Sequence, residues 1–477
     1  MRRLFSGDGE RTLRLRNIAA YGSGDVFGAG ATVVIGLYFF FFLTENVGFS
    51  PLVAGMVFAG GKLIDAITDP LMGYLSDITR SRFGRRRIYF LIGIIPIWIT
   101  FFLLWLPIGD TPVILQFFFY SICYILFSLV YTLVMVPYSA LNAEISRSRQ
   151  GRMRLAGARM FFALFITLAA VLVPNWLIDL LDIRGYYIMG AFFATLFCAP
   201  WLLVFWGTWE LPYKHSVESI SFREYNRRFF QILKSRTARS HMLMYAASYA
   251  SIDILMVLAV YYFTYYLGTP QYMYHLTLAV MMLTMIIVLP IYYTLSKRFS
   301  IRLLYGCALL IWGSGLVWGY CMMQPGSHWG IILGAGAYLG SGMAGAMMLP
   351  WAIFPTVTDI GEYFTGENRA GMYAGVLTLI RKLVQGVLVM PLIAITLYSI
   401  GYIPQLFPQA PAVAVGLQRM FFFAPLIFIA IGLIAVIRLP LTQARTAILQ
   451  ETLAKLRSGI QTDRIDAAAS KQLNRLL

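Results

Sequence analysis

Long apolar segments constrain this chain more than any other feature. Twelve of them alternate with polar loops, and most are long enough to cross a bilayer as a helix, which takes about 20 apolar residues. The chain is 59% hydrophobic and only 12% charged, a composition that excludes the soluble globular classes. The sequence therefore predicts an all-α membrane protein. Its expected spans are residues 18–43, 52–76, 88–107, 113–138, 160–180, 186–208, 242–267, 272–294, 301–322, 328–354, 371–399 and 420–438.

Positive charge is distributed unevenly between the loops. The formal net charge is +17, and 33 of the 38 lysines and arginines lie in the two ends of the chain and in alternate loops. The opposite loops hold only Arg184 and Arg419. Since cytoplasmic loops collect Lys and Arg, we expect both termini in the cytoplasm. The basic balance is thus mainly a topology signal, with some contact to anionic lipid headgroups, and not a sign of nucleic-acid binding.

The spans divide six and six around a polar central loop. We expect an N-terminal half over residues 1–208, the loop over 209–241, a C-terminal half over 242–440 and a cytoplasmic tail over 441–477. The loop is expected to carry a short amphipathic helix near residues 222–233. In the tail, apolar residues at helical spacing favour a helix on the inner membrane surface, and a disordered tail is equally compatible. Two six-helix halves are typical of the major facilitator fold.

Charged residues inside the spans are the best candidates for function, because burying a charge in a bilayer is costly. Seven of them lie away from the span ends: Asp25, Lys62, Asp65, Asp69, Asp253, Arg381 and Lys382. Three of these, Lys62, Asp65 and Asp69, share one helical face, and Thr68 lies beside them. The two carboxylates and the hydroxyl suit a hard cation such as Na⁺, or the carboxylates share a proton. A purely structural Lys62–Asp65 ion pair is the alternative.

Cysteine and histidine give no sign of other chemistry. All four cysteines fall in spans, and the four histidines are scattered at or near loops. The sequence therefore predicts no disulfide, no cofactor and no metal beyond a transported cation. A nucleophile–base set is not apparent either, so we expect a transporter and not an enzyme.

Two groups of residues carry a family resemblance. Gly73-Tyr-Leu-Ser-Asp77, followed by Gly84-Arg85-Arg86-Arg87, resembles the cytoplasmic loop signature of the major facilitator superfamily, in which the glycine permits close helix approach. The segment from Lys62 to Pro70, with its Asp-Ala-Ile-Thr-Asp-Pro core, is similar to the glycoside–pentoside–hexuronide:cation symporters, the group of the melibiose permease. Supporting matches are Tyr21–Asp25, Tyr131–Thr132, Val136–Tyr138, Arg159–Phe162, Asp359–Tyr363 and Arg381–Leu383.

The resemblance implies roles for individual residues. Asp65 and Asp69 match the cation-binding acids of the family, Thr132 matches a threonine of the same site, and Thr68 stands where an asparagine is usual. Lys382 matches a lysine near the cation and sugar sites, and Lys62 replaces an arginine. The cytoplasmic gate is expected to comprise Gly73, Asp77, Arg85 and Arg152, with Arg152 pairing with Asp359 or Glu362.

The sugar-reading residues depart from the family pattern. Ala29, Met135 and Ser139 stand where the melibiose permease has two carboxylates and a tryptophan, and a nearby arginine is kept only as Arg159. Either Asp25, Asp253, Thr132 and Tyr38 read the sugar differently, or the substrate is not a simple galactoside.

Asp253 lies about eleven residues into its span, near mid-membrane at ~1.5 Å per residue. It either faces a substrate cavity or pairs with Lys382. Arg381 points about 100° away from Lys382 and is expected to pack against another helix or a headgroup.

These observations predict a cation-coupled (Na⁺ or H⁺) secondary active symporter. Its expected cargo is a sugar or glycoside, taken up by alternating access through a bacterial cytoplasmic (inner) membrane. Two alternatives remain open: a cation-coupled carrier of a lysophospholipid or another amphipathic solute, and a non-transporting sensor built on a carrier fold.

Overall fold

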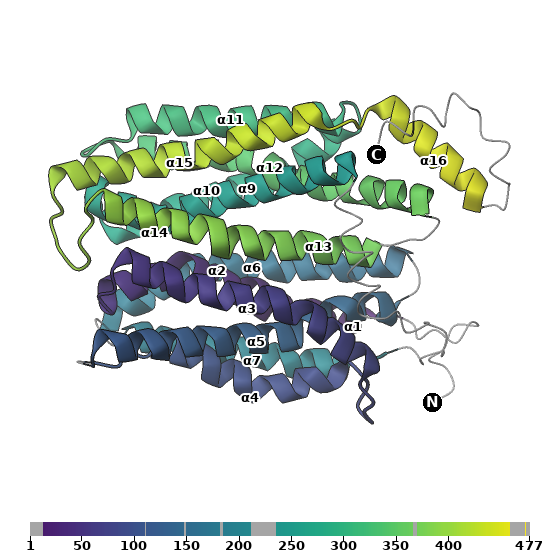
Figure 1. The fold of residues 1–477 in the computed structure, drawn as a ribbon, viewed down its shortest axis with the longest axis horizontal. Helices are drawn as coiled ribbons and strands as arrows, with labels where there is room; N and C mark the ends of the chain where they lie inside the picture. Colours follow the sequence, from purple (N-terminus) through teal and green to yellow (C-terminus); the bar gives the residue numbers. More distant parts are fainter. Residues whose placement is uncertain are drawn as a thin grey trace. The chain divides into compact units, whose positions relative to one another are not determined.

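The computed structural model describes residues 13–109, 111–146, 149–181, 185–210, 235–365, 370–457 and 473, and within these ranges all regular structure is helical (Figure 1). The chain divides into two compact units. Unit 1 comprises residues 1–215 and 386–409, and unit 2 comprises residues 216–385 and 410–477.

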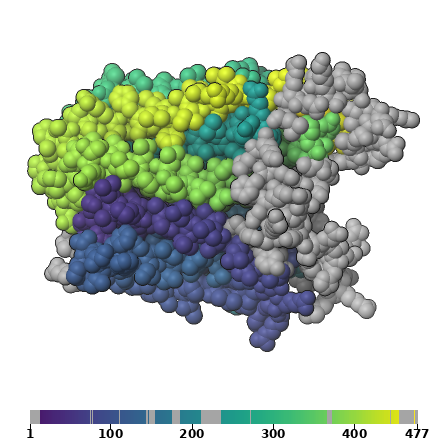
Figure 2. All heavy atoms as spheres, viewed as in Figure 1, coloured from purple at the N-terminus to yellow at the C-terminus, as the bar shows by residue number. Residues whose placement is uncertain are grey.

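Unit 1 is a bundle in which α3 packs on α5 and α14, and α4 packs on α5 and α7. The helix α2 packs on α6 and α7. In Figure 2 the green atoms that include α14 border the purple atoms that include α3. Its elements are α1 Leu15–Gly22, α2 Asp25–Val34, η1 Ile35–Phe39, η2 Phe42–Asn46, α3 Pro51–Ile78, α4 Arg87–Leu103, α5 Val113–Ile145, α6 Arg149–Leu181, α7 Gly185–Gly207 and α14 Met390–Ser399.

Unit 2 is built around α12, which packs on α10, α11 and α9. Two glycines allow the first two contacts, because a Cβ at Gly340 would lie 2.3 Å from the Met281 carbonyl oxygen and one at Gly342 only 2.4 Å from the Trp312 backbone. The elements are α9 Arg236–Tyr261, η4 Tyr262–Leu267, α10 Gln271–Ser296, α11 Ile301–Met322, α12 Trp329–Thr365, α13 Ala370–Leu383, α15 Pro411–Arg438 and α16 Gln443–Arg457; the π-helix η5 Val384–Val389 runs across the unit boundary.

Serine residues mark several helix starts. Ser50, Ser235 and Ser300 each precede a helix, and each side-chain oxygen accepts a hydrogen bond from the backbone N–H three residues later. Such caps satisfy backbone donors that the helix itself leaves unpaired. Helix α3 also has Pro51 at its first position, where a missing N–H costs nothing.

The predicted all-α, many-span architecture is confirmed. Eleven segments of the described chain are long and apolar enough to cross a membrane, and the shorter apolar α4 corresponds to the third predicted span. The first span is more complex than predicted, because it breaks at Ser23 and Gly24 and continues through two π-helical segments. At Gly24 a Cβ would lie 2.6 Å from the ring of Tyr138, so only glycine allows this approach.

The last span and the tail also differ in detail. Helix α15 begins at Pro411, nine residues before the predicted start of the span, because Pro411 occupies a favourable first position. In the tail, α16 packs on α12 and buries Leu449 and Leu453. Part of the tail's apolar stripe therefore contacts protein. The helix predicted near residues 222–233 lies outside the described residues.

Candidate functional site

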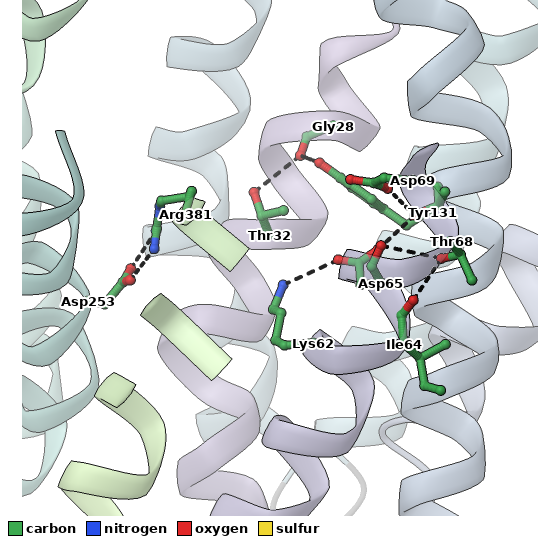
Figure 3. A network of polar contacts seen from close by, with 11 residues as sticks. Gly28, Thr32, Lys62, Ile64, Asp65, Thr68, Asp69, Tyr131, Asp253 and Arg381 are labelled. Atoms are coloured by element: carbon green, nitrogen blue, oxygen red, sulfur yellow. Dashed lines mark hydrogen bonds and ion pairs between the residues drawn. The ribbon is translucent and has the colours of Figure 1, made fainter. Parts of the chain in front are cut away.

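The two acids of the central stripe meet at one hydroxyl group in unit 1. Asp65 and Asp69 lie on α3, and Thr132 faces them from α5. The Oγ1 atom of Thr132 is 2.7 Å from Oδ1 of Asp65 and 2.8 Å from Oδ1 of Asp69 (Figure 3 shows the acids). Asp65 is only 2% exposed, and Thr132 is buried as well. Three of the four predicted cation-site residues are therefore in direct contact.

This geometry concentrates negative charge. A hydroxyl group carries a single proton and can donate it to only one carboxylate at a time. With both acids ionised, one of the two short oxygen–oxygen contacts has no proton between its atoms. A shared proton or a bound cation would relieve this repulsion, and the oxygen atoms are ligands of the type that hard cations prefer.

Lys62 and Thr68 lie beside this cluster and contact it less directly. The Nζ atom of Lys62 is 3.9 Å from Oδ2 of Asp65, which is an electrostatic contact and too long for a hydrogen bond. The hydroxyl oxygen of Thr68 is 3.0 Å from the backbone carbonyl oxygen of Ile64 and 3.3 Å from that of Asp65, and its one proton points toward these two acceptors. Its proton is therefore engaged within α3, while its oxygen retains acceptor capacity.

Asp25 and Arg159 form a forked ion pair in the same unit. Nε of Arg159 donates to one carboxylate oxygen of Asp25, and Nη2 donates to the other at 3.0 Å. The guanidinium lies 4.6 Å from the centre of the Tyr138 ring. Two parallel bonds make this a strong and geometrically specific contact. Both residues were predicted as solute-binding candidates, and the structure places them together.

Tyr131 connects the two polar clusters of unit 1. Its hydroxyl donates to the backbone carbonyl of Gly28 on α2, at 2.9 Å, and Thr32 donates to the same carbonyl (Figure 3). Gly28 lies close to Asp25, since a Cβ there would be 2.8 Å from Oδ1 of that acid. Tyr131 precedes Thr132 on α5, so one helix contacts both clusters.

The pairing of Asp253 differs from the sequence-based alternatives. In unit 2 its carboxylate accepts two bonds from Arg381, one from Nη1 and one from Nη2 at 2.7 Å (Figure 3). The sequence predicts either a cavity-facing Asp253 or a pair with Lys382, and it predicts that Arg381 packs against another helix or a headgroup. The ion pair of Asp253 with Arg381 corrects the choice of Lys382 as the partner. The turn geometry of the helix explains the outcome, because neighbouring residues point about 100° apart and only one of them faces α9. Lys382 is half-buried beside it.

The positions that resemble sugar-reading sites are largely apolar here. Ala29 is half-buried, Met135 is buried and Ser139 is exposed. The methyl group of Met135 would lie 2.4 Å from a Cβ at Gly28, so the methionine fills the space beside that glycine.

The cytoplasmic gate residues are described only in part. Asp359 and Glu362 are half-buried on α12, whereas the side chains of Asp77 and Arg152 lie outside the described residues. The close approach expected at Gly73 is not present among the described atoms, since the nearest one to a Cβ there would be Cγ1 of Val136 at 4.0 Å.

Glu210 organises the loop that contains Arg85, and sequence reasoning missed it. Its carboxylate accepts backbone N–H groups from Arg85, Arg86 and Arg87 at 2.9, 3.0 and 2.8 Å. These donors stand at the start of α4, where a negative charge is favourable. Gly84 allows the turn with a φ of +105°, and a Cβ there would lie 2.5 Å from Oε1 of Glu210. An acid just after a span was the available signal.

The described residues are all helical where they are regular, and they hold eleven candidate spans with ion pairs inside them, which defines a multi-pass integral membrane protein of the transporter class. The chain belongs to the MFS/sugar transport protein family, which matches residues 20–443. It is therefore a transporter and not an enzyme, as the sequence predicts.

Three relatives illustrate the range of this similarity. A proposed sulfoquinovose importer of Salmonella typhimurium is 28% identical, over 87% of each chain. A proposed glycoside/cation symporter of Escherichia coli is 36% identical, over 32% of this chain and 33% of its own. A sodium-dependent lysophosphatidylcholine symporter of Danio rerio is 30% identical, over 31% of this chain and 27% of its own.

Solved structures share the fold. The D-xylose-proton symporter superposes with a TM-score of 0.64 at 16% identity, covering 89% of this chain and 96% of the other. This similarity establishes the major facilitator fold.

Proposed function

We propose that this protein is a cation-coupled secondary active symporter that takes up a sugar or glycoside by alternating access. The observation that carries the proposal is the contact of Thr132 with both Asp65 and Asp69. Two carboxylates on one hydroxyl, with Asp65 buried, are costly in a membrane unless positive charge offsets both of them. The Lys62 ammonium, 3.9 Å from Asp65, offsets one negative charge, so a second positive charge is needed. Na⁺ or H⁺ would supply that charge, and Thr68 and Lys62 adjust the field around it.

Coupling follows from linkage between two sites. If the cation orders the cluster around Thr132 and thereby raises the affinity for solute, the solute raises the affinity for the cation by the same factor. The contact from Tyr131 to the Gly28 carbonyl is the physical route between the acids and the Asp25–Arg159 pair. That pair, with Asp253 and Lys382, supplies the candidate solute-binding groups.

The sugar assignment rests on the relatives with glycoside and sulfoquinovose in their names. A sugar needs buried donors and acceptors, and the forked Asp25–Arg159 pair offers both.

Closure at the cytoplasmic side is assigned to residues that flank the spans. Gly73, Asp77, Arg85 and Arg152 on the N-terminal half would meet Asp359 and Glu362 of the C-terminal half. The halves comprise residues 1–208 and 242–440, with the loop 209–241 and the tail 441–477 in the cytoplasm of a bacterial inner membrane. The excess of basic residues on that side supports this orientation.

The test is the melting temperature of the purified protein with sugars, glycosides and lysolipids, each with and without Na⁺ at fixed ionic strength and at several pH values. A ligand of the folded state raises the melting temperature by mass action. We expect a larger shift with one sugar when Na⁺ is present or when the pH falls. A sugar shift that is independent of both cations would contradict coupling.

A lysophospholipid is the second candidate cargo. The apolar Ala29 and Met135 at positions where sugar-reading acids are expected favour it, as does the partial similarity to the lysophosphatidylcholine symporter. That similarity covers less than a third of either chain, so it carries less weight than the sugar relatives. A rise in melting temperature with lysolipids and not with sugars or glycosides would favour a lysophospholipid as the cargo.

A further inference from the structure

The Asp253–Arg381 pair repeats a device already present in unit 1. The first span contains Tyr21-Gly-Ser-Gly-Asp25, and α9 contains Tyr249-Ala-Ser-Ile-Asp253, with tyrosine, serine and aspartate at the same three positions. In each unit an arginine from a later helix donates hydrogen bonds to the aspartate from two nitrogen atoms. These arginines are Arg159 on α6 and Arg381 on α13. Each guanidinium also lies over a tyrosine ring.

Aromatic side chains surround the pair in unit 2. The guanidinium of Arg381 lies 4.8 Å from the centre of the Tyr249 ring, and Nε1 of Trp351 donates to the Tyr249 hydroxyl at 3.1 Å. The Trp351 ring meets the Tyr245 ring edge to face, with centres 5.5 Å apart. Trp351 itself is 44% exposed, although its indole nitrogen is held in place. An accessible, oriented aromatic surface therefore adjoins a forked ion pair.

The chemistry of this surface selects for hydroxyl groups. The carboxylate and the guanidinium neutralise each other, yet each retains hydrogen-bonding capacity: Asp253 has further lone pairs, and Arg381 has five N–H donors in all. A hydroxyl can donate to the acid and accept from the guanidinium at once. An anionic group would compete with Asp253 for Arg381 and would meet a like charge. Flat aromatic faces complete the apolar part of such sites.

We infer that Asp253, Arg381, Tyr249 and Trp351 form a recognition surface of unit 2 for an uncharged, hydroxyl-rich solute, that is, a neutral sugar or glycoside. This inference rests on the proposed symport function and deepens it by restricting the solute to an uncharged sugar or glycoside and by naming three recognition residues beyond Asp253. The ion pair supplies hydroxyl contacts, and the indole supplies a stacking face.

The first test uses two tryptophans on the same helix. Trp351→Ala removes the proposed stacking face, and Trp329→Ala is the matched control, since Trp329 is also on α12 and is 57% exposed. The measurement is cation-driven uptake of a neutral nitrophenyl glycoside panel into proteoliposomes. We expect Trp351→Ala to raise KM at least tenfold and Trp329→Ala to leave it unchanged. Equal KM values in the two variants would overturn the stacking role.

The second test separates recognition from a merely structural ion pair. Asp253→Asn and Arg381→Gln each leave one charge unpaired, whereas the double variant removes both and relieves that cost. A structural pair predicts that the double variant recovers stability and transport together. Recognition predicts recovered stability with KM still raised at least tenfold. If a single variant does not fold, the double variant and Trp351→Ala still decide the matter.

Two controls keep this inference distinct from the proposed function. The cation-induced rise in melting temperature, measured without solute, should persist in all these variants because the Asp65 cluster is unaltered. Wild-type protein without any cation-driven uptake would refute the symport function itself. Wild-type uptake of glucuronate in preference to every neutral glycoside would leave symport intact and overturn the solute class.

Discussion

The hydroxyl oxygen of Thr132 lies 2.7 Å from a carboxylate oxygen of Asp65, so a residue of α5 completes a cluster that begins on α3. The contact joins residues 67 positions apart in the chain. Because the three side chains are in direct contact, a change in any one of them should alter cation binding.

Removing either acid should uncouple transport. Asp65→Cys and Asp69→Cys are each expected to abolish cation-driven solute accumulation while the protein remains inserted in the membrane. In coupled systems, one ligand typically changes the affinity for the other by about 5–150-fold. In these variants we expect the cation to have no effect on solute affinity. Accumulation assays with Na⁺ and pH gradients measure this. Wild-type accumulation in both variants would refute the cation-site assignment.

Thr132 should matter through its oxygen atom. Thr132→Val keeps the shape of the side chain but loses the hydroxyl. We expect this loss to weaken cation binding by about 1.4 kcal/mol, which is a tenfold lower apparent cation affinity. Thr132→Ser should retain most of the affinity. The control is Thr100→Val, because that buried hydroxyl donates to the Pro96 carbonyl of its own helix. A titration of melting temperature against cation concentration distinguishes them, and an equal loss in Thr100→Val would mean a general packing effect.

Removing one partner of the Asp25–Arg159 ion pair should lower the stability of the fold more than removing both partners. Arg159→Gln leaves a buried carboxylate without its cation, which typically destabilises a protein by about 3–5 kcal/mol. The double variant Asp25→Asn/Arg159→Gln should recover much of that stability and still transport poorly. Thermal unfolding and uptake of the same preparations give both quantities. If the double variant were less stable than the single one, the uncompensated-charge explanation would be wrong.

Glu210 should stabilise the backbone conformation of the turn before α4. Glu210→Ala removes the acceptor of three backbone N–H groups, and losing a helix cap costs about 0.5–2 kcal/mol. Since about 1.4 kcal/mol is a factor of ten, amide hydrogen exchange at residues 85–87 should accelerate about 2- to 30-fold. Glu451→Gln, an exposed position on α16, serves as the control. Unchanged exchange in Glu210→Ala would show that the turn is held by other contacts.

Adjacent glycines of α3 provide a test of packing. A Cβ at Gly61 would lie 2.2 Å from the Tyr124 ring, whereas a Cβ at Gly60 would meet no described atom within 4 Å. Gly61→Ala should destabilise the protein by about 1–3 kcal/mol through overpacking, while Gly60→Ala should be neutral or slightly stabilising. Melting temperatures of the two variants suffice. Equal values would mean that Tyr124 moves aside without cost.

The sequence by itself determined the membrane class, most span positions and the candidate polar residues. These follow from local properties, since a bilayer excludes unpaired charge and demands about 20 apolar residues for each crossing, wherever the neighbouring helices lie. The stripe of Asp65 and Asp69 was likewise predictable from local spacing, because residues four positions apart lie on the same face of a helix. Its resemblance to known symporters suggested Thr132 as a further member.

The tertiary structure decided the pairings. Whether Asp253 meets Lys382 or Arg381 depends on how α13 is rotated against α9, and a rotation of about 100° exchanges neighbouring residues. The caps of Glu210 on α4 and the contact of Tyr131 with Gly28 likewise join distant parts of the chain. Side-chain packing between helices sets such rotations. Hydropathy and spacing along one helix carry no information about the face its neighbour presents, so these contacts emerge only once the helices are packed.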